Sequence, residues 1–566
     1  MKPGRSDQLK TIQVEWRASA ASTSARKFRR HSPGRKIYSP NGRLLFSAES
    51  FRGESVFLTN GTYSLTYKDL PTILQAARHL FEDACRTLNM EYADFTGASK
   101  CVAGIDTTNR IESILWMVFC WVNTIPFVPF HPENPGALNV FRPDVVIRTS
   151  GGKQSISHSS NDGNGLTYYE IPVFQRSLPG DETGHSQVAA SPDLTLKTLI
   201  PFTHHPDVIF CGLATSGTSG RPKGVALLRK NMIAATRNAF REVRAATDTR
   251  EHLWGHCLPL HHTGGISIVF RALLSGTGIY LWDRFDSRNI LDALRNQPAI
   301  KRISLVPTML HRLLDYQEGY RMPYDAGLNQ LLVGGGPANP GLVHHARKMG
   351  WPVTFSYGMT ETCGQIASQK LDGSSPDRSV GSPFPDHEIQ IRDDQGKELA
   401  PDMIGSLHVR GPQLFPGYLS ESDTLNSFIS KVHGSSGDRW FDTGDFARAD
   451  SRGNLYIEAR RTDLIISGGE NINPEEIESI LQQCSEIDDA GVTWIPDHEW
   501  GQLVVALIVP KSRNPEAEQR ILAFTSSRLK AYMRPKRIGY IGSLPRSALG
   551  KIERKKLQEL AINQFA

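Results

Sequence analysis

One ten-residue segment carries the side chains that a nucleotide phosphate chain requires. Residues 215–224 read Thr-Ser-Gly-Thr-Ser-Gly-Arg-Pro-Lys-Gly, with four hydroxyls, three glycines and Lys223. Glycine lets backbone N–H groups approach an anion, hydroxyls donate hydrogen bonds, and the lysine supplies a mobile cation. The residue order is not that of a Walker A loop. A surface linker is the alternative, but the segment follows a strand-like run at 208–213, and we predict a phosphate loop joining that strand to a helix.

This segment resembles the phosphate loop of the adenylate-forming superfamily, which comprises acyl-CoA synthetases, adenylation domains of peptide synthetases and luciferases. Four further stretches resemble other motifs of the superfamily, and they follow in its order. They are Tyr-Gly-Met-Thr-Glu-Thr at 357–362 (adenine and magnesium), Asp-Thr-Gly-Asp at 442–445 (ribose), 460–474 (hinge and crossover) and Pro-Arg-Ser-Ala-Leu-Gly-Lys at 545–551 (lysine motif). Five ordered matches exclude coincidence.

The resemblance implies an ATP site. Tyr357 would stack on adenine, Thr360 would donate to the α-phosphate, Glu361 would bind Mg²⁺, and Asp445 would accept hydrogen bonds from both ribose hydroxyls. The glycines at 334–336 would let the backbone approach the adenine edge. The ATP-binding residues implied are Thr215, Ser216, Gly217, Thr218, Ser219, Gly220, Lys223, Gly334, Gly335, Gly336, Tyr357, Gly358, Asp445 and Arg460.

Lys551 is the implied catalytic lysine, acting with Thr360, Glu361 and His262. Its ammonium group would lower the repulsion between an attacking carboxylate and the α-phosphate of ATP. The C-terminal part would then turn about Thr462, where the family usually has Asp or Lys, and open a channel for the thiol of coenzyme A. The channel and hinge residues implied are Thr462, Gly468, Gly469 and Glu470.

The segment Leu258–Arg271 is the expected acyl pocket. No Asp lies between Leu258 and Leu274 to hold an amino group, which disfavours an amino acid as substrate. Stretches around the pocket, the 357–362 motif and the hinge resemble 2-succinylbenzoate-CoA ligases of menaquinone biosynthesis. A second substrate carboxylate would need a cation, but Arg271 is more typical of a charge on a helix surface. The pocket residues implied are His262, Thr263, Gly264 and Gly265.

The elements that must position these residues alternate between strand-like and helix-like runs. Such alternation predicts parallel βαβ construction in the N-terminal part, in which we also expect a hairpin turning at Asn60-Gly61 and a buried apolar helix around residues 114–122. After Pro383 the pattern changes to short strands and glycine turns, and near residue 460 it returns to α+β. The expected fold class is α/β, with a large body and a small mobile C-terminal domain. The expected domains are a basic arm at 1–45, the body at 46–459 with a β-rich subdomain from about 383, and the C-terminal domain at 460–566.

The 566-residue chain has 39% hydrophobic and 22% charged residues, which suits a folded protein. Ten Lys or Arg against Asp7 and Glu15 in the first 40 residues supply all of its net charge of +6. A solvated tail, a transit-like leader and a segment that binds an acidic partner all remain open for this arm, and the body has no nucleic-acid signature. No run is long and apolar enough to span a membrane. Seven cysteines without a CxxC pair favour a reduced, cytoplasmic setting, with organellar targeting open.

The prediction from sequence is an acid–CoA ligase that uses ATP, Mg²⁺ and coenzyme A on a small carboxylic acid, most like a 2-succinylbenzoate-CoA ligase. Three alternatives stay open: an aryl-, medium- or long-chain acyl-CoA synthetase, an enzyme that loads a carrier protein, and a non-catalytic nucleotide-binding protein. The sequence leaves the oligomeric state open, with a homodimer as one option.

Overall fold

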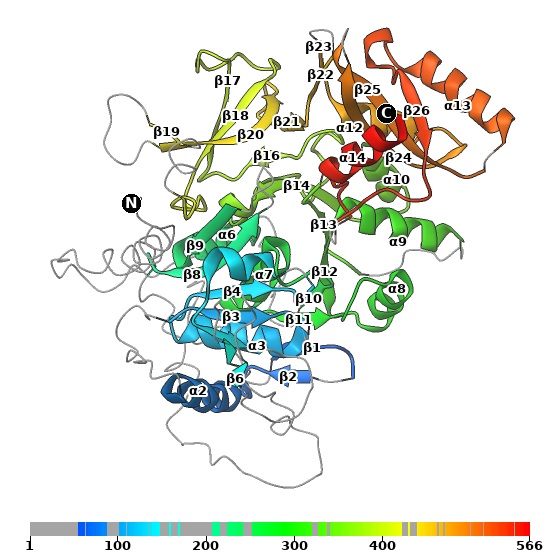
Figure 1. Cartoon of the computed structure of the whole chain (residues 1–566). Helices are drawn as coiled ribbons and strands as arrows, with labels where there is room; N and C mark the ends of the chain where they lie inside the picture. The colour runs from blue at the N-terminus through cyan, green and yellow to red at the C-terminus, as the bar shows by residue number, and fades with distance from the viewer. Residues whose placement is uncertain are drawn as a thin grey trace.

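A computed structural model of the chain gives the arrangement of the body and of the C-terminal part (Figure 1). The basic arm, most of the polar stretch at 149–165 and the phosphate-loop residues 216–222 lie outside the described residues. The structure describes residues 55–62, 64–87, 101–108, 110–133, 135–147, 158–159, 168–169, 206–215, 223–240, 252–319, 327–336, 340–420, 428–430, 439–460, 463–467, 470–497, 500–512, 514–547 and 550–565.

The largest described sheet has nine strands, and its centre is parallel, as the alternating pattern predicts. At one edge, the hairpin predicted at Asn60-Gly61 forms, with Gly61 at a φ of 91°. In order across the sheet, the strands are β16 (Ser382–Pro383), β15 (Gly364–Ser368), β14 (Val353–Met359), β13 (Gln330–Val333), β12 (Ile300–Leu305), β10 (Leu253–His256), β11 (Gly278–Leu281), β1 (Val56–Thr59) and β2 (Ser64–Thr66).

A second, five-stranded sheet carries the strand before the phosphate loop. The strand-to-helix prediction is wrong here, because residues 216–222 connect two antiparallel strands. The run Lys223–Leu228 is apolar and almost wholly buried, so it pairs with the preceding strand before the next helix begins. In order, the strands are β5 (Val145–Ile147), β3 (Ala103–Asp106), β4 (Phe127–Phe130), β8 (Ile209–Thr215) and β9 (Lys223–Leu228); β6 (His158–Ser159) and β7 (Tyr168–Tyr169) form a separate pair.

Helices α3, α6 and α7 contribute to the main core together with both sheets, while α8, α9 and α10 pack with the other face of the large sheet. The buried helix predicted around residues 114–122 is confirmed, since every residue of α3 from Glu112 onward is buried. None of the described helices is long and apolar enough to cross a membrane. The body helices are α2 (Leu70–Thr87), α3 (Arg110–Val122), α4 (Gly136–Phe141), α6 (Arg229–Ala239), α7 (Thr263–Ser275), α8 (Ser287–Asn296), α9 (Pro307–Gly319) and α10 (Pro340–Lys348).

The β-rich sequence pattern after Pro383 corresponds to an antiparallel sheet with five described strands. The hinge predicted near residue 460 falls at the end of its last strand, and the predicted domain boundaries stay predictions. The strands are β17 (Glu388–Arg392), β18 (Gly405–Arg410), β19 (Phe428–Ser430), β20 (Arg439–Ala449) and β21 (Leu455–Arg460).

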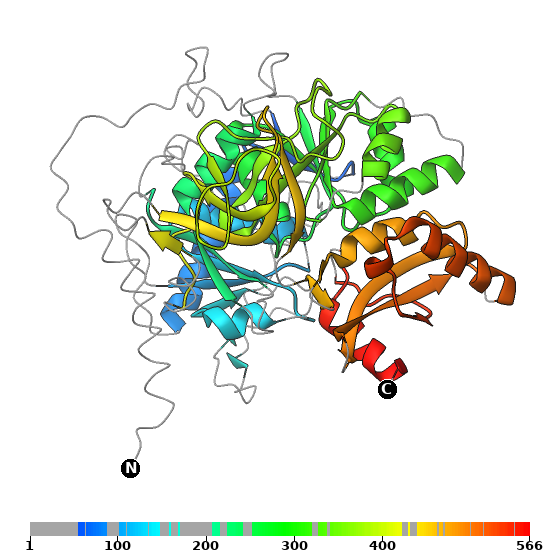
Figure 2. The same ribbon diagram turned by 90° about the horizontal axis from the view of Figure 1, so that it is seen from above.

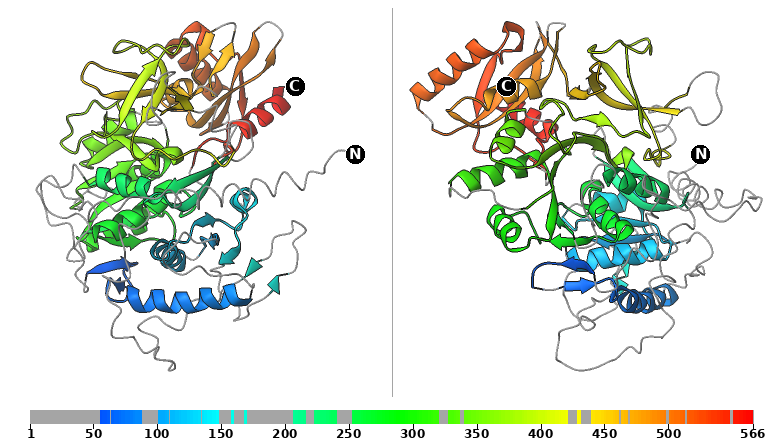
Figure 3. Two further views of the ribbon diagram at one scale, coloured as in Figure 1. Left: turned by 90° about the vertical axis from the view of Figure 1, so that its left-hand side faces the viewer. Right: turned by 180° about the vertical axis from the view of Figure 1, so that it is seen from behind.

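The C-terminal part has its own sheet and its own hydrophobic clusters. It lies beside α9 in the view from above, at the opposite end of the molecule from α2 (Figures 2 and 3). The α/β fold class with a small α+β C-terminal domain is therefore confirmed. Its elements are β22 (Ile465–Ser467), β23 (Glu470–Ile472), α12 (Pro474–Leu481), β24 (Ile487–Asp497), β25 (Gly501–Pro510), α13 (Pro515–Arg528), the 3-10 turn η5 (Ala531–Met533), β26 (Arg537–Tyr540) and α14 (Arg554–Phe565).

Candidate functional site

Two of the predicted ATP-binding side chains meet although they are 88 positions apart in the chain. The Tyr357 hydroxyl at the end of β14 donates a 2.5 Å hydrogen bond to Oδ2 of Asp445 on β20. Asp445 is only 4% exposed, and its backbone pairs with that of Arg460 on β21. The predicted adenine and ribose residues thus lie together. The described part of the structure does not include the side chain of Arg460 or the residues Ser216, Gly217, Thr218, Ser219 and Gly220.

The local geometry of β20 fixes the direction of the Asp445 side chain. Gly444 adopts a φ of 75°, and its N–H donates to Asp442 Oδ1 at 3.0 Å. Thr443 Oγ1 accepts the Asp445 N–H at 3.2 Å and donates to the Leu407 carbonyl at 2.9 Å. These bonds occupy the neighbouring side chains and leave the Asp445 carboxylate directed toward Tyr357.

A glycine turn follows β13, as predicted, and lies beside the residue before Tyr357. A Cβ on Gly334 would lie 2.7 Å from Oγ of Ser356, and Gly335 has a φ of 77°. A Cβ on Gly336 would lie 3.3 Å from Pro307. Gly358 has a different explanation, because its Cβ would lie 2.0 Å from the carbonyl oxygen of residue 364 on the neighbouring strand β15. Strand packing alone therefore accounts for that glycine.

Tyr418 lies between Lys223, a predicted phosphate-binding residue, and Glu361, the predicted magnesium ligand, and no sequence motif identified it. Tyr418 donates a 2.8 Å hydrogen bond to Oε1 of Glu361, and Nζ of Lys223 lies 4.9 Å from the centre of its ring. Glu361 lies in the 3-10 turn η4 (Thr360–Thr362) and is 8% exposed. Thr215 Oγ1 lies 3.4 Å from the carbonyl oxygen of Lys223. The only local signal for Tyr418 is the Pro-Gly turn that precedes it.

A hydrogen bond between two threonine hydroxyls connects the predicted acyl pocket with the residue predicted to bind the α-phosphate. Thr263 Oγ1, at the start of α7, donates a 3.1 Å hydrogen bond to Oγ1 of Thr360. His262 precedes the helix, with its ring centroid 4.5 Å from that of His261. A Cβ on Gly265 would lie 2.2 Å from the Pro259 carbonyl oxygen, so the tight approach of the chain requires glycine there. A Cβ on Gly264 would meet only Leu258, at 3.2 Å.

Both pocket histidines are uncharged at neutral pH. The pKa of His262 is lowered to about 4, mainly by burial and to a smaller extent by the charge of Lys551. The pKa of His261 is lowered to about 3, mainly by burial and to a smaller extent by the neighbouring His262. The Lys551 ammonium is therefore close enough to His262 for its charge to act on the ring.

Lys551 reaches this position because its loop rests on the body. Gly550 has a φ of 74°, and a Cβ there would lie 2.3 Å from Oγ1 of Thr308 in the first turn of α9. The predicted hinge and channel residues are less fully described. The described residues do not include Thr462, Gly468 or Gly469. Only the backbone of Glu470 is described, and it pairs with Ser467 in β22.

The prediction that Arg271 is a helix-surface charge is wrong. Arg271 is 2% exposed, and its guanidinium lies 5.5 Å from the centre of the Trp254 ring. Helix α7 is buried from Gly265 to Leu274, so the turn that carries Arg271 faces the core. Nη1 of Arg271 lies 3.5 Å from Oε1 of Gln365. A Cβ on Gly364 would lie 3.6 Å from Arg271 and 4.0 Å from Thr263, so a buried cation lies next to the acyl pocket.

Burial lowers the pKa of Arg271 to about 10, so the side chain stays charged at neutral pH. Among the described residues, no carboxylate forms an ion pair with it. An unpaired buried cation is costly, which makes this position a candidate for binding an anion.

Comparisons with known proteins agree with this arrangement. The AMP-binding enzyme family matches residues 137–419, and the AMP-binding enzyme C-terminal domain matches residues 476–551. A 2-succinylbenzoate–CoA ligase of Enterococcus faecalis is 37% identical over 344 residues, which are 60% of this chain and 67% of the relative. The corresponding ligase of Bacillus licheniformis is 37% identical over 376 residues, covering 66% and 73%.

Solved structures show the same fold. One is o-succinylbenzoate CoA synthetase from Bacillus subtilis in complex with the acyl-adenylate intermediate OSB-AMP, with a TM-score of 0.72 and 26% identity over 90% of this chain and 96% of that one. The same enzyme in complex with ATP and magnesium has a TM-score of 0.71 and 26% identity, covering 90% and 98%. From its motifs, its fold and these matches, the chain belongs to the family of AMP-binding, adenylate-forming enzymes.

Proposed function

We propose that this protein is an ATP-dependent acid–CoA ligase that converts 2-succinylbenzoate into its coenzyme A thioester through an acyl adenylate, in menaquinone biosynthesis. The observation that carries the proposal is the position of Lys551, whose loop packs through Gly550 against Thr308 of the body and whose charge acts on His262, near the Thr263–Thr360 hydrogen bond. The names of the relatives at 37% identity support the choice of acid.

In the first half-reaction, a carboxylate oxygen of the acid attacks the α-phosphorus of ATP, and pyrophosphate leaves. Lys551 approaches from the C-terminal part and offsets the charge that builds up between the two anions. Thr360 can donate to the α-phosphate, since its hydroxyl already accepts the bond from Thr263. Asp445 and Tyr357 hold the nucleoside end.

The residues present also fit a magnesium ion. Glu361 offers carboxylate oxygens held in place by Tyr418, and hard oxygen donors are the ligands that Mg²⁺ prefers. When bound with the nucleotide, the ion would neutralise charge on the phosphates. Lys223, next to Tyr418, adds a second positive charge on the same side.

The buried Arg271 suits the second carboxylate of 2-succinylbenzoate. A Cβ on Gly364 would lie 3.6 Å from its Nη2 and 4.0 Å from Thr263, which bonds to Thr360, so one substrate could contact both the reacting position and this cation. A planar guanidinium binds a carboxylate with two parallel hydrogen bonds. An acid without a second carboxylate would leave Arg271 buried without an anion, which favours a dicarboxylate as substrate.

In the second half-reaction, the thiolate of coenzyme A attacks the activated carbonyl and AMP leaves. Lys551 has no catalytic role in this step, because no carboxylate approaches the α-phosphate. We infer that the C-terminal part, from about residue 460, turns near Thr462, withdraws Lys551 and brings residues 468–470 to the thiol channel. We also infer a cytoplasmic location, which agrees with seven free, buried cysteines. A homodimer stays a prediction that analytical ultracentrifugation would test.

A panel of carboxylic acids tests the proposal. Release of AMP is measured with ATP, Mg²⁺ and coenzyme A, and 2-succinylbenzoate is expected to give the highest kcat/KM. A monocarboxylic aryl acid serves as the matched control for the second carboxylate. Acyl-adenylate formation that ignores free coenzyme A would point to a carrier protein as acceptor, and no turnover of any acid would refute the ligase function.

A further inference from the structure

The loop that carries Lys551 is closed by short backbone bonds. The Ser547 N–H donates to the Lys551 carbonyl at 2.8 Å, and the Gly550 N–H donates to the Ser547 carbonyl at 2.8 Å. Arg546 and Ile552 form a β-bridge at the base of the loop. The direction of the Lys551 side chain therefore depends on how this loop is held.

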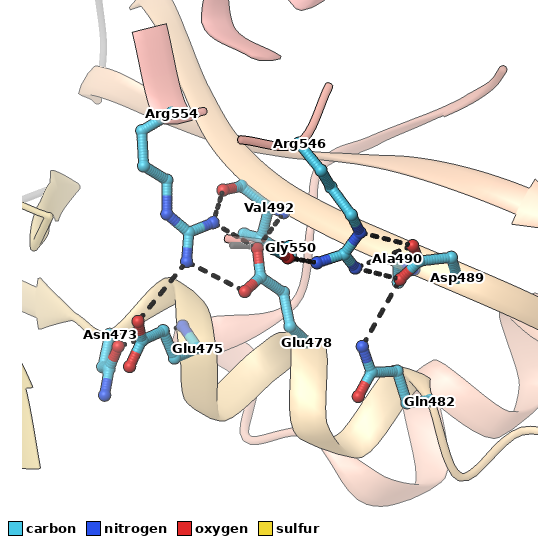
Figure 4. Close-up of polar contacts among 10 residues, drawn as sticks. All are labelled: Asn473, Glu475, Glu478, Gln482, Asp489, Ala490, Val492, Arg546, Gly550 and Arg554. Carbon is cyan, nitrogen blue, oxygen red and sulfur yellow. Dashed lines mark hydrogen bonds and ion pairs between the residues drawn. The ribbon is translucent and has the colours of Figure 1, made fainter. Parts of the chain in front are cut away.

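The Arg546 side chain turns back over its own loop. Nη1 of Arg546 donates a 2.6 Å hydrogen bond to the carbonyl oxygen of Gly550 (Figure 4). That carbonyl belongs to the peptide group that joins Gly550 to Lys551. Fixing its oxygen fixes the peptide plane immediately before Lys551, because the peptide group is planar.

Asp489 on β24 anchors the other side of the Arg546 guanidinium. Nε of Arg546 lies 3.1 Å from Oδ2 of Asp489, and Nη2 lies 2.7 Å from Oδ2 and 2.8 Å from Oδ1 (Figure 4). Asp489 also accepts the Ala490 N–H at 2.9 Å, so its carboxylate is fixed relative to a long paired strand. The guanidinium thus uses all three nitrogens to join the sheet to the peptide before Lys551, and each side chain of the pair is 25% exposed.

We propose that Arg546 and Asp489 are positioning residues, which hold the Lys551 loop in the geometry needed for acid activation. This inference rests on the proposed function and adds two residues that touch no substrate. A fork that binds a carboxylate and a carbonyl together is specific to Arg, and Lys cannot reproduce it. The pair matters only while Lys551 is in use, so the thioester half-reaction does not depend on it.

The test compares Asp489→Asn, Arg546→Gln and Arg546→Lys with the wild type in each half-reaction separately. Acid-dependent ATP–pyrophosphate exchange is expected to fall by about 10- to 100-fold, because small misplacements of catalytic groups have effects of this size. Thioester formation from supplied acyl adenylate is expected to stay within about threefold, and Arg546→Lys should fail to rescue the exchange. Arg520→Gln is the matched control, because Arg520 pairs with Glu486 at 2.9 Å in the same domain.

Hydrogen–deuterium exchange of the peptide spanning residues 544–553 provides a readout that needs no turnover. Faster exchange is expected in the three variants and not in the Arg520→Gln control. Unchanged exchange in this peptide, an equal loss in both half-reactions, or rescue by Arg546→Lys would each overturn the inference. If the wild type activated no acid, the proposed function would fail, and deuterium exchange alone would still decide whether the pair holds the loop.

Discussion

Replacing Gly550 with alanine should separate the two half-reactions, because it places an atom where the C-terminal part meets the body. The added Cβ would lie 2.3 Å from Oγ1 of Thr308 and 3.0 Å from its Cβ. Turning the Thr308 side chain moves Oγ1 away but leaves the second contact at the lower limit that carbon atoms tolerate. To restore a 3.0 Å contact with Oγ1, the loop would have to move by about 0.7 Å, a displacement that can cost about tenfold or more in rate.

The backbone strain of this substitution does not discriminate between the two half-reactions. Gly550 has a φ of 74°, and an alanine in this left-handed region costs about 1 kcal/mol. That cost stays with the loop wherever the C-terminal part lies. The contact with Thr308 exists only while the loop rests on α9, so only acid activation should suffer from it.

The assay is acid-dependent ATP–pyrophosphate exchange beside thioester formation from supplied acyl adenylate. Gly550→Ala is expected to slow the first by about tenfold relative to the second. Thr308→Ala removes Oγ1, so it should restore most of the exchange in the double variant while changing little on its own. Equal losses in both half-reactions, or no recovery in the double variant, would refute the reasoning.

Four further substitutions test the individual residues. Lys551→Ala should reduce pyrophosphate exchange by about 100-fold or more and spare thioester formation, and equal losses in both would contradict a withdrawn lysine. Asp445→Ala should weaken ATP binding about 10- to 100-fold in calorimetry, and unchanged affinity would count against its ribose role. Tyr418→Phe removes the hydrogen bond to Glu361 and should raise the magnesium concentration needed for half-maximal exchange about fivefold, with no change if the tyrosine only packs. Arg271→Gln should lower kcat/KM for 2-succinylbenzoate about 10- to 100-fold but not for a monocarboxylic acid, and equal losses for both acids would exclude recognition of the second carboxylate.

Local sequence patterns predicted the parts of the fold that depend on neighbouring residues. The apolar run of α3 predicted a buried helix, and Asn60-Gly61 predicted the hairpin between β1 and β2. Strand β9 was missed because a short apolar run before a helix has no distinguishing period. The phosphate loop was therefore assigned to the wrong kind of connection, although its residues were chosen for their chemistry.

The site residues that the sequence did not reveal are those whose partners lie far along the chain. Tyr418 meets Glu361 across 57 positions, and Arg546 meets Asp489 across another 57. No spacing rule connects such pairs, because strand order and packing decide which side chains face each other. Arg271 was misjudged for a related reason, since helical periodicity cannot identify a solvent-facing side on a helix that is buried on every side.

The two cations at the acyl pocket differ in how they are held, and this difference matches the chemistry proposed for them. Arg271 is built into a buried helix, whereas Lys551 is carried by a loop of the C-terminal part that packs against Thr308 of the body. A carboxylate distant from the reaction keeps its charge through both half-reactions and needs a permanent partner. The reacting carboxylate loses its charge once the adenylate forms, and a fixed cation there would then occupy space that the thiol must enter. A permanent arginine with a removable lysine is therefore the arrangement that a dicarboxylic substrate would require.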